Sequence, residues 1–244
     1  MKKILKVIMT LILFIFSFFY TKKAIIFLQN NDSLMKEINN KKNNYYINYT
    51  NAIITKNYMI PGISGKKINE IKSYTKMKKI NYFSESLIVY DEIAPKISIN
   101  NNYDKVILKG NPNIKQVGLI IDINNNLNNV NNILINNNIH IDIYSNNYIN
   151  LNNLNIKNIV TDNYYHFTNY CLYNEKNINL LCQNNKKYTI KVSHIKSLQD
   201  VKNNLSNGII FLYTINNYQD LNIIIKYLKN NNYEIKSLDK LVKE

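Results

Sequence analysis

Three side chains in the second half of the chain could perform acid–base chemistry, namely Asp122, Asp142 and His194. Asp122 ends the apolar run 117–121, and Asp142 lies in the alternating run 139–144, so both acids belong to predicted strands. His194 follows a later predicted strand. Two nearby carboxylates can separate their pKa values into an acid and a base, as in glycoside hydrolysis. Together with His194 they form a candidate hydrolytic site.

These side chains also have structural interpretations. Asp142 could accept hydrogen bonds from Tyr144 or from a neighbouring backbone amide, and His140 could be an ordinary surface histidine. Asp122 stands apart, because the chemistry of α/β folds lies just beyond the carboxyl ends of the strands. We therefore expect any active site to lie at Asp122.

A cluster of aromatic side chains follows the third predicted strand and includes Tyr164, Tyr165 and Tyr170. Aromatic faces stack on sugar rings in glycan-binding clefts, so these three tyrosines are candidate ligand-binding residues. Core packing and codon bias are the alternatives, since the chain contains 20 tyrosines.

The elements that must position these residues alternate between strand and helix. Residues 117–121 form a short apolar run typical of a strand buried on both faces. Leu127, Val130, Ile133 and Leu134 then share one face of a predicted helix, before the strand that carries Asp142. Further strands are predicted at residues 156–160, 188–192, 208–212 and 233–235, and further helices at 195–205, 221–228 and 238–242. This alternation predicts an α/β fold with a mainly parallel sheet.

The composition excludes two classes of function. The net charge of +15 would suit nucleic acid, but the lysines are scattered and the chain contains no arginine, the side chain that reads bases and phosphates as a fork. Cys171 and Cys182 lack CxxC spacing and histidine neighbours, which argues against a zinc site. We expect two packed apolar thiols there, with a disulfide as the alternative outside the cytoplasm.

The N-terminal residues 1–23 resemble an export signal. Three lysines precede the uncharged run 7–20, and two lysines follow it without a small-residue cleavage motif. This pattern predicts an uncleaved signal-anchor, a single-pass helix in the cell membrane with the body outside the cytoplasm; a cleaved signal peptide is the alternative. Residues 24–57 are predicted to be a linker and membrane-proximal segment, and residues 58–112 an N-terminal extension.

The remaining part, residues 113–244, resembles the polysaccharide deacetylase (NodB-homology) family. Its end, NGIIFLYTINNYQDLNIIIKYLKNNNYEIKSLDKLV, is similar to the closing strand, helix, turn, strand and Leu-rich helix of that family. VGLIIDIN resembles the family's first motif, and NIHIDIYSNN resembles its second strand. The extension resembles that of membrane-anchored members from low-GC Gram-positive bacteria. The resemblance implies a shortened, irregular (β/α) barrel with an N-terminal transmembrane helix and a small α+β extension.

The family's hydrolytic machinery is only partly matched. The resemblance implies a divalent metal that is held by an aspartate and a His-x-x-x-His pair and activates water, with a second aspartate as base and a late histidine as acid. Asp122 matches the base, and His166 is out of register with the histidine pair. The other family positions fall on Ile123, Asn163, Phe167 and Tyr213. We therefore predict that no metal or other cofactor is bound.

The resulting hypothesis is a membrane-anchored pseudoenzyme at the cell envelope, with cell-wall glycan as its candidate partner. The alternative is an atypical active carbohydrate deacetylase or hydrolase that uses Asp122 and Asp142.

Overall fold

The computed structural model describes residues 2–122, 127–174, 180–215 and 217–244, which form two compact units. The first unit comprises Met1–Asn48 and Gly65–Ile93, and the second comprises Tyr49–Ser64 and Ala94–Glu244. The predicted boundaries after residues 57 and 112 both fall inside the second unit, and the predicted extension 58–112 is divided between the two units.

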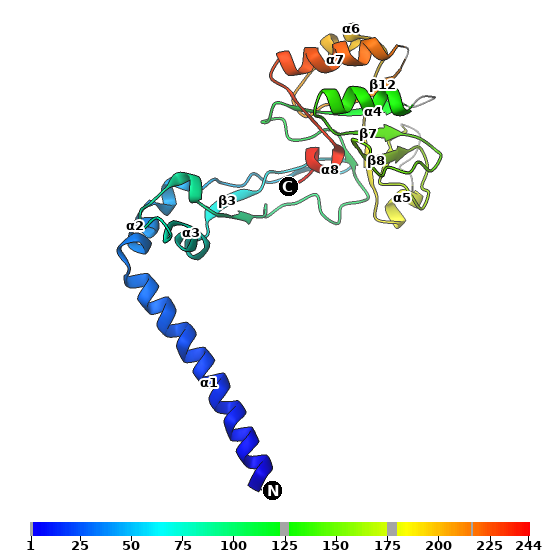
Figure 1. Ribbon diagram of the computed structural model, residues 1–244. Helices are drawn as coiled ribbons and strands as arrows, with labels where there is room; N and C mark the ends of the chain where they lie inside the picture. Colours follow the sequence, from blue (N-terminus) through cyan, green and yellow to red (C-terminus); the bar gives the residue numbers. More distant parts are fainter. Residues whose placement is uncertain (1, 123–126, 175–179, 216) are drawn as a thin grey trace. The chain divides into compact units, whose positions relative to one another are not determined.

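The first unit begins with the long helix α1 (Lys2–Asn31), which is blue in Figure 1. Within it, Ile8–Asn31 is long and apolar enough to cross a membrane, and none of this stretch is buried against protein. A signal sequence has the same properties. The structure thus contains one helix that could be either a membrane anchor or a signal sequence.

The rest of the first unit is a small α+β body, as predicted for the extension. Its helix α2 begins at an aspartate cap, because Asp32 accepts a hydrogen bond from the Leu34 amide at 2.9 Å. The same carboxylate accepts from the Lys78 ammonium at 2.6 Å, which ties α2 to the segment after α3. The elements are α2 (Ser33–Lys41), η1 (Lys42–Tyr45), β3 (Gly65–Ile68), α3 (Glu70–Met77), η2 (Glu85–Leu87) and β4 (Tyr90–Ile93), with β3 and β4 antiparallel.

The second unit is built on an eleven-stranded, mainly parallel sheet. The strand order is β1-β2-β5-β10-β9-β8-β7-β6-β12-β11, with β13 also paired to β6, and every pairing except β1–β2 is parallel. The strands are β1 (Ile53–Ile54), β2 (Tyr58–Ile60), β5 (Val106–Ile107), β6 (Gln116–Asp122), β7 (Ile141–Tyr144), β8 (Ile156–Thr161), β9 (Tyr170–Leu172), β10 (Tyr188–Ile190), β11 (Ser193–Ile195), β12 (Ile210–Thr214) and β13 (Glu234–Lys236). The predicted fold class, a shortened, irregular (β/α) barrel, is confirmed, since the sheet is a mixed α/β half-barrel.

Two apolar cores cover the two faces of this sheet. On the outer face, the helices α4 (Leu127–Asn136), α6 (Leu198–Asn204) and α7 (Tyr218–Asn230) pack on the sheet (Figure 1). On the inner face, the short helix α8 (Leu238–Leu241) packs through its two leucines against residues such as Ile120 and Leu212. A Cβ atom on Gly118 would approach Leu241 Cδ2 to 2.9 Å, so this glycine lets α8 lie directly on β6.

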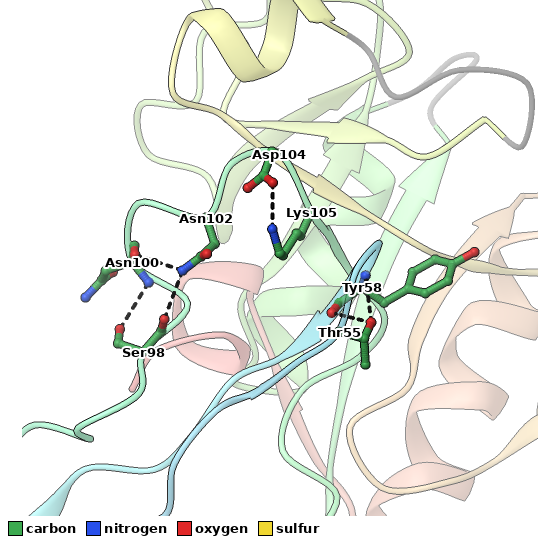
Figure 2. A network of polar contacts seen from close by, with 7 residues as sticks. All are labelled: Thr55, Tyr58, Ser98, Asn100, Asn102, Asp104 and Lys105. Atoms are coloured by element: carbon green, nitrogen blue, oxygen red, sulfur yellow. Dashed lines mark hydrogen bonds and ion pairs between the residues drawn. The ribbon is translucent and has the colours of Figure 1, made fainter.

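Asparagine side chains complete the loops that bring these strands together. Ahead of β5, the Asn102 side chain donates through Nδ2 to the Ser98 carbonyl at 3.2 Å, and the Asn100 backbone N–H donates to Ser98 Oγ at 3.0 Å (Figure 2). Asparagine also tolerates the left-handed conformation. Five of the six non-glycine residues with positive φ in the described ranges are asparagines: Asn81, Asn101, Asn138, Asn153 and Asn232.

The two cysteines form a disulfide, so the prediction of unpaired packed thiols is wrong. Cys171 lies on β9 and Cys182 on the short helix α5 (Leu180–Asn184), with a Cα–Cα separation of 6.5 Å. Both side chains are fully buried, which is why the sequence pattern resembled an apolar pair. The bond fastens α5 to the sheet.

Candidate functional site

The candidate site lies at the carboxyl ends of β6, β7 and β8. Asp122, the last residue of β6, pairs in register with Tyr144 at the end of β7, which in turn pairs with Val160 near the end of β8. Because the three strands are parallel, the loop residue Asp162 falls at the same edge. We refer to Asp122, Tyr144, Asp162 and His194 as the carboxyl-edge cluster.

Hydrogen bonds hold Asp162 in place within this cluster. The Tyr144 hydroxyl donates to the Asp162 carboxylate, and Asn146 Nδ2 donates to the Tyr144 hydroxyl oxygen at 3.1 Å and to Asp162 Oδ2 at 3.4 Å. Burial, followed by the bond to Asp162, raises the pKa of Tyr144 to about 12. Tyr144 therefore remains a proton donor at neutral pH, and Asp162 is a fixed acceptor.

Asp122 is only half-buried, and its pKa is raised. Burial is the main cause, and the nearby negative charge of Asp162 adds to it, whereas His194 acts in the opposite direction. Asp122 thus holds its proton more tightly than an exposed aspartate does. Such a group can donate a hydrogen bond or a proton to a ligand.

A polar cavity of about 410 Å³ opens beside this cluster. Asp162 and His194 line it together with Lys191, Tyr173 and Asn174. This volume lies within the usual range of small-ligand pockets, and the lining offers both acceptors and donors. The arrangement suits a small polar ligand.

Asp142 lies away from this cluster and is fully buried beneath it. Its carboxylate accepts hydrogen bonds from Asn158 Nδ2 at 2.7 Å and from the Leu238 amide at 2.6 Å. Burial raises the pKa of Asp142 to about 7. The two donors belong to β8 and to the start of α8. Asp142 thus has a structural role, in which its carboxylate accepts a hydrogen bond from a backbone amide.

The carboxylate whose negative charge raises the pKa of Asp122 is that of Asp162, which was not among the predicted site residues. The structure thus brings Asp122 and His194 together with Asp162. The signal that could have found Asp162 is the one that selected Asp122, namely an acid directly after an apolar strand. Asp162 was not predicted because the strand was expected to end at residue 160, whereas β8 ends at Thr161, directly before Asp162.

The three candidate ligand-binding tyrosines occupy two different environments. Tyr165 stacks on Phe167, with ring centroids 5.3 Å apart and planes inclined by 1°, and Phe167 meets Tyr148 edge-on at 5.8 Å. Tyr164 contacts His166 edge-on at 6.3 Å. Tyr170, in contrast, lies on β9 and packs against the inner core, where burial raises its pKa. Tyr164 and Tyr165 thus belong to the surface loop, and Tyr170 belongs to the barrel interior.

The residues around the cluster do not fit the divalent metal that the fold family uses. Asp162 and His166 are four residues apart, as in the family's histidine pair, but the Asp162 carboxylate already accepts two side-chain hydrogen bonds. Within the ranges that the structure describes, no three His, Cys, Asp or Glu side chains are grouped so as to hold a metal ion. Ile123, at the position of the family's metal aspartate, lies outside the described residues.

Tyr213 cannot take the place of the family's late histidine. Its side chain is fully buried in the outer core, on the opposite face of the sheet from the cluster. Thr214 is the residue of β12 that pairs with Asp122. The late motif was placed on residue 213, whereas the next residue of the same strand is level with Asp122, because a shift of one residue exchanges the two faces of a strand.

Comparison with known proteins gives one sequence relative. No model of a known protein family matches the chain. An uncharacterized protein of Bacillus subtilis (strain 168), YlxY, is 32% identical over 103 residues, which are 42% of this chain and 32% of that protein. The match therefore spans about a third of that relative's length.

Comparison with solved structures identifies the fold. Wild-type BA3943 from Bacillus anthracis, described as a CE4 family pseudoenzyme, superimposes with a TM-score of 0.65 at 19% identity and covers 88% of this chain and 96% of its own. A BA3943 mutant described as having restored enzymatic activity gives a TM-score of 0.62 at 18% identity, over 87% of this chain and 99% of its own. The resemblance to the polysaccharide deacetylase family is thus confirmed at the level of the fold.

Proposed function

We propose that this protein is a membrane-anchored, extracytoplasmic polysaccharide-deacetylase-like domain without metal-dependent hydrolysis, which binds glycan or supports structure at the cell envelope. The carboxyl-edge cluster carries this proposal. A hydrolytic metal site needs about three protein ligands around one ion. Here Asp162 is instead engaged by Tyr144 and Asn146, and among the described residues no three His, Cys, Asp or Glu side chains are grouped so as to hold a metal ion.

Three further observations support the location and the loss of activity. Helix α1 has the length and composition of a membrane anchor. The Cys171–Cys182 disulfide is of the kind that persists in oxidising surroundings outside the cytoplasm. The similar fold of BA3943 belongs to a protein described as a pseudoenzyme.

Metal analysis combined with a deacetylation assay tests the loss of activity. The purified full chain is loaded with zinc, dialysed and assayed for bound metal and for acetate release from acetylated glycan, beside an active deacetylase of the same fold. We expect substoichiometric zinc and no acetate release from this chain. Stoichiometric zinc together with acetate release would overturn the proposal.

The surface aromatic residues support the glycan-binding role. Tyr165 is 37% exposed and its ring is held by Phe167, so it presents a preorganised face on which a sugar could stack. We expect the Y164A/Y165A variant to lose retention on insoluble cell-wall glycan. The matched control is Y82A, which removes a tyrosine that is 61% exposed in the first unit. Unchanged retention of Y164A/Y165A would reject this role.

The alternative function, an atypical hydrolase, is favoured by one observation. Asp122 has a raised pKa and faces a second carboxylate, as in a glycosidase acid–base pair, although the second carboxylate is Asp162 instead of the predicted Asp142. Metal-independent hydrolysis that D122N and D162N both abolish would establish this function. Loss of activity in D122N and D142N, with D162N still active, would restore the predicted pair.

A further inference from the structure

A second cavity lies at the opposite, amino-terminal edge of the sheet. Its volume is about 290 Å³, and it is formed by residues 138–140 just before β7, by Lys229 at the end of α7, and by residues 233–237 and Lys240 around β13. None of these residues belongs to the carboxyl-edge cluster. We refer to this space as the amino-edge cavity.

The lining of the amino-edge cavity is positively charged. Lys229, Lys236 and Lys240 contribute three positive charges and Glu234 one negative charge, so that the lining carries a net charge of +2. Glu234 lies 3.1 Å from the Lys236 ammonium and neutralises part of that charge only. The Lys229 ammonium donates to the backbone carbonyl of residue 137, which fixes its position at the rim.

The pKa of His140 is lowered, in part by the lysines around this cavity. Burial lowers this pKa first, and the ammonium groups of Lys157 and Lys240 lower it further, whereas Asp239 acts in the opposite direction. The electrostatic surroundings of His140 are therefore cationic in spite of the neighbouring carboxylate. His140 lines the cavity in a form that can offer a ring N–H to an anion.

Ser237 supplies a second, independent indication of a ligand. It lines the cavity and is 1% exposed, and among the residues that the structure describes no group forms a hydrogen bond with its hydroxyl. A buried hydroxyl without a partner is unfavourable, and most such groups in proteins are satisfied. The hydroxyl oxygen has almost no accessible surface, so it can donate its proton to an anion in the cavity once the side chain rotates toward it.

We propose that the amino-edge cavity binds a phosphate group. Lysine binds phosphate as a point charge, and a phosphate ester with up to two negative charges matches the net charge of the lining. The volume is at the lower limit of ligand pockets, so the cavity holds the phosphate end of a larger molecule. Two sources share this chemistry, a phosphorylated sugar and the headgroup of a phospholipid. This site is independent of the function proposed for the opposite edge.

Calorimetric titration of the full chain in neutral detergent tests the proposal. Inorganic phosphate should bind saturably, and acetate should bind more weakly. K229A/K240A should weaken phosphate binding by about tenfold or more, since each variant removes a charged donor. S237A should weaken it severalfold without a loss of stability, because it removes a hydroxyl that has no partner in the free protein. K96A/K196A removes two exposed lysines that lie outside the cavity, so it is the charge-matched control and should bind as the wild type does.

Two further ligands separate the sources. Tighter binding of glucose 1-phosphate than of glycerophosphoglycerol would indicate a phosphorylated glycan, and the reverse order would indicate a lipid headgroup. Absence of saturable binding of any phosphate, or equal affinity of the wild type, K229A/K240A and S237A, would overturn the proposal. Circular dichroism of each variant confirms that a loss of binding does not come from unfolding.

Discussion

Asp122 and Asp142 lie on neighbouring parallel strands, two residues apart in register, and both face the interior of the half-barrel. Asp142 pairs in register with Ile120, whereas Asp122 pairs with Tyr144. Asp142 is fully buried and accepts hydrogen bonds from β8 and α8. Asp122 is half-buried at the edge of the sheet, beside the like charge of Asp162. The two aspartates therefore lie in adjacent layers of inward-facing side chains, yet their surroundings are very different.

The hydrogen-bond donors around each carboxylate distinguish a structural acid from a functional one on the same sheet. The donors to Asp142 are an amide side chain and a backbone N–H, so that its carboxylate completes the fold by receiving the start of α8. Within the described ranges, no group donates a hydrogen bond to the Asp122 carboxylate, and its pKa is raised by burial and by a like charge. A group left in that state is available to a ligand.

The largest effect should come from removal of the buried acid. Asp142→Ala would leave the Asn158 amide and the Leu238 N–H without an acceptor and would open a cavity under α8, so the free energy of unfolding should fall by about 3–5 kcal/mol. Asp122→Ala should change it by less than about 1 kcal/mol. Urea unfolding of both variants measures the difference. Equal losses would show that the two acids do not differ in the way described.

Ionisation of Asp142 should make the stability fall as the pH rises. Burial raises the pKa of Asp142 to about 7, so the native state keeps a proton that the unfolded chain releases near the ordinary aspartate value of about 4. This contribution to stability is complete below about pH 4 and is lost as the pH rises through about 7, a decrease of about 4 kcal/mol. Urea unfolding across this range measures it, and Asp142→Asn, which cannot ionise, should lose most of the decrease. An unchanged pH dependence in Asp142→Asn would contradict the assignment.

The sequence was sufficient for the elements whose apolar pattern is long. The periodicity of residues 117–121 and 221–228 correctly predicted β6 and α7, and the alternation of strands and helices predicted the parallel sheet. Two strands of three residues were missed. Residues 170–172 adjoin the aromatic cluster and form β9, and residues 193–195 form β11 ahead of a helix that begins at Leu198. The strands β10 and β13 are equally short but fall in the predicted runs 188–192 and 233–235, whereas residues 170–172 and 193–195 carry too little apolar pattern to identify a strand.

The candidate site was harder to predict than the fold, because it depends on which residues face each other across strands. Asp122 and His194 were selected from strand ends alone, but the partner carboxylate at residue 162 follows a strand whose end was set one residue too early. The late motif was placed on Tyr213, which faces the outer core, whereas its neighbour Thr214 pairs with Asp122. The disulfide was missed for a related reason, since spacing alone does not reveal that β9 and α5 lie together.

Loss of the disulfide should affect the carboxyl edge more than the amino edge. Cys171→Ser with Cys182→Ser opens a loop with a sequence separation of 11 residues, and chain-entropy arguments predict a loss of about 2–3 kcal/mol in the free energy of unfolding. Leu172, Tyr173 and Asn174 directly follow Cys171 and line the cavity beside Asp162. We therefore expect glycan retention to fall while phosphate binding at the amino-edge cavity is unchanged. Equal losses at both edges would indicate general destabilisation.

The smallest effect should be an electrostatic one that is confined to the carboxyl-edge cluster. Asp162→Asn removes the like charge and should lower the pKa of Asp122, whereas Tyr144→Phe removes a hydrogen bond to Asp162 but keeps its charge and should leave the pKa of Asp122 raised. Carboxyl carbon titration by NMR measures both variants. The pKa of Asp142 should be the same in each, because its hydrogen bonds go to Asn158 and Leu238. An Asp122 titration that is identical in the wild type and Asp162→Asn would mean that burial alone raises the pKa of Asp122, and the pairing of these two carboxylates would have to be abandoned.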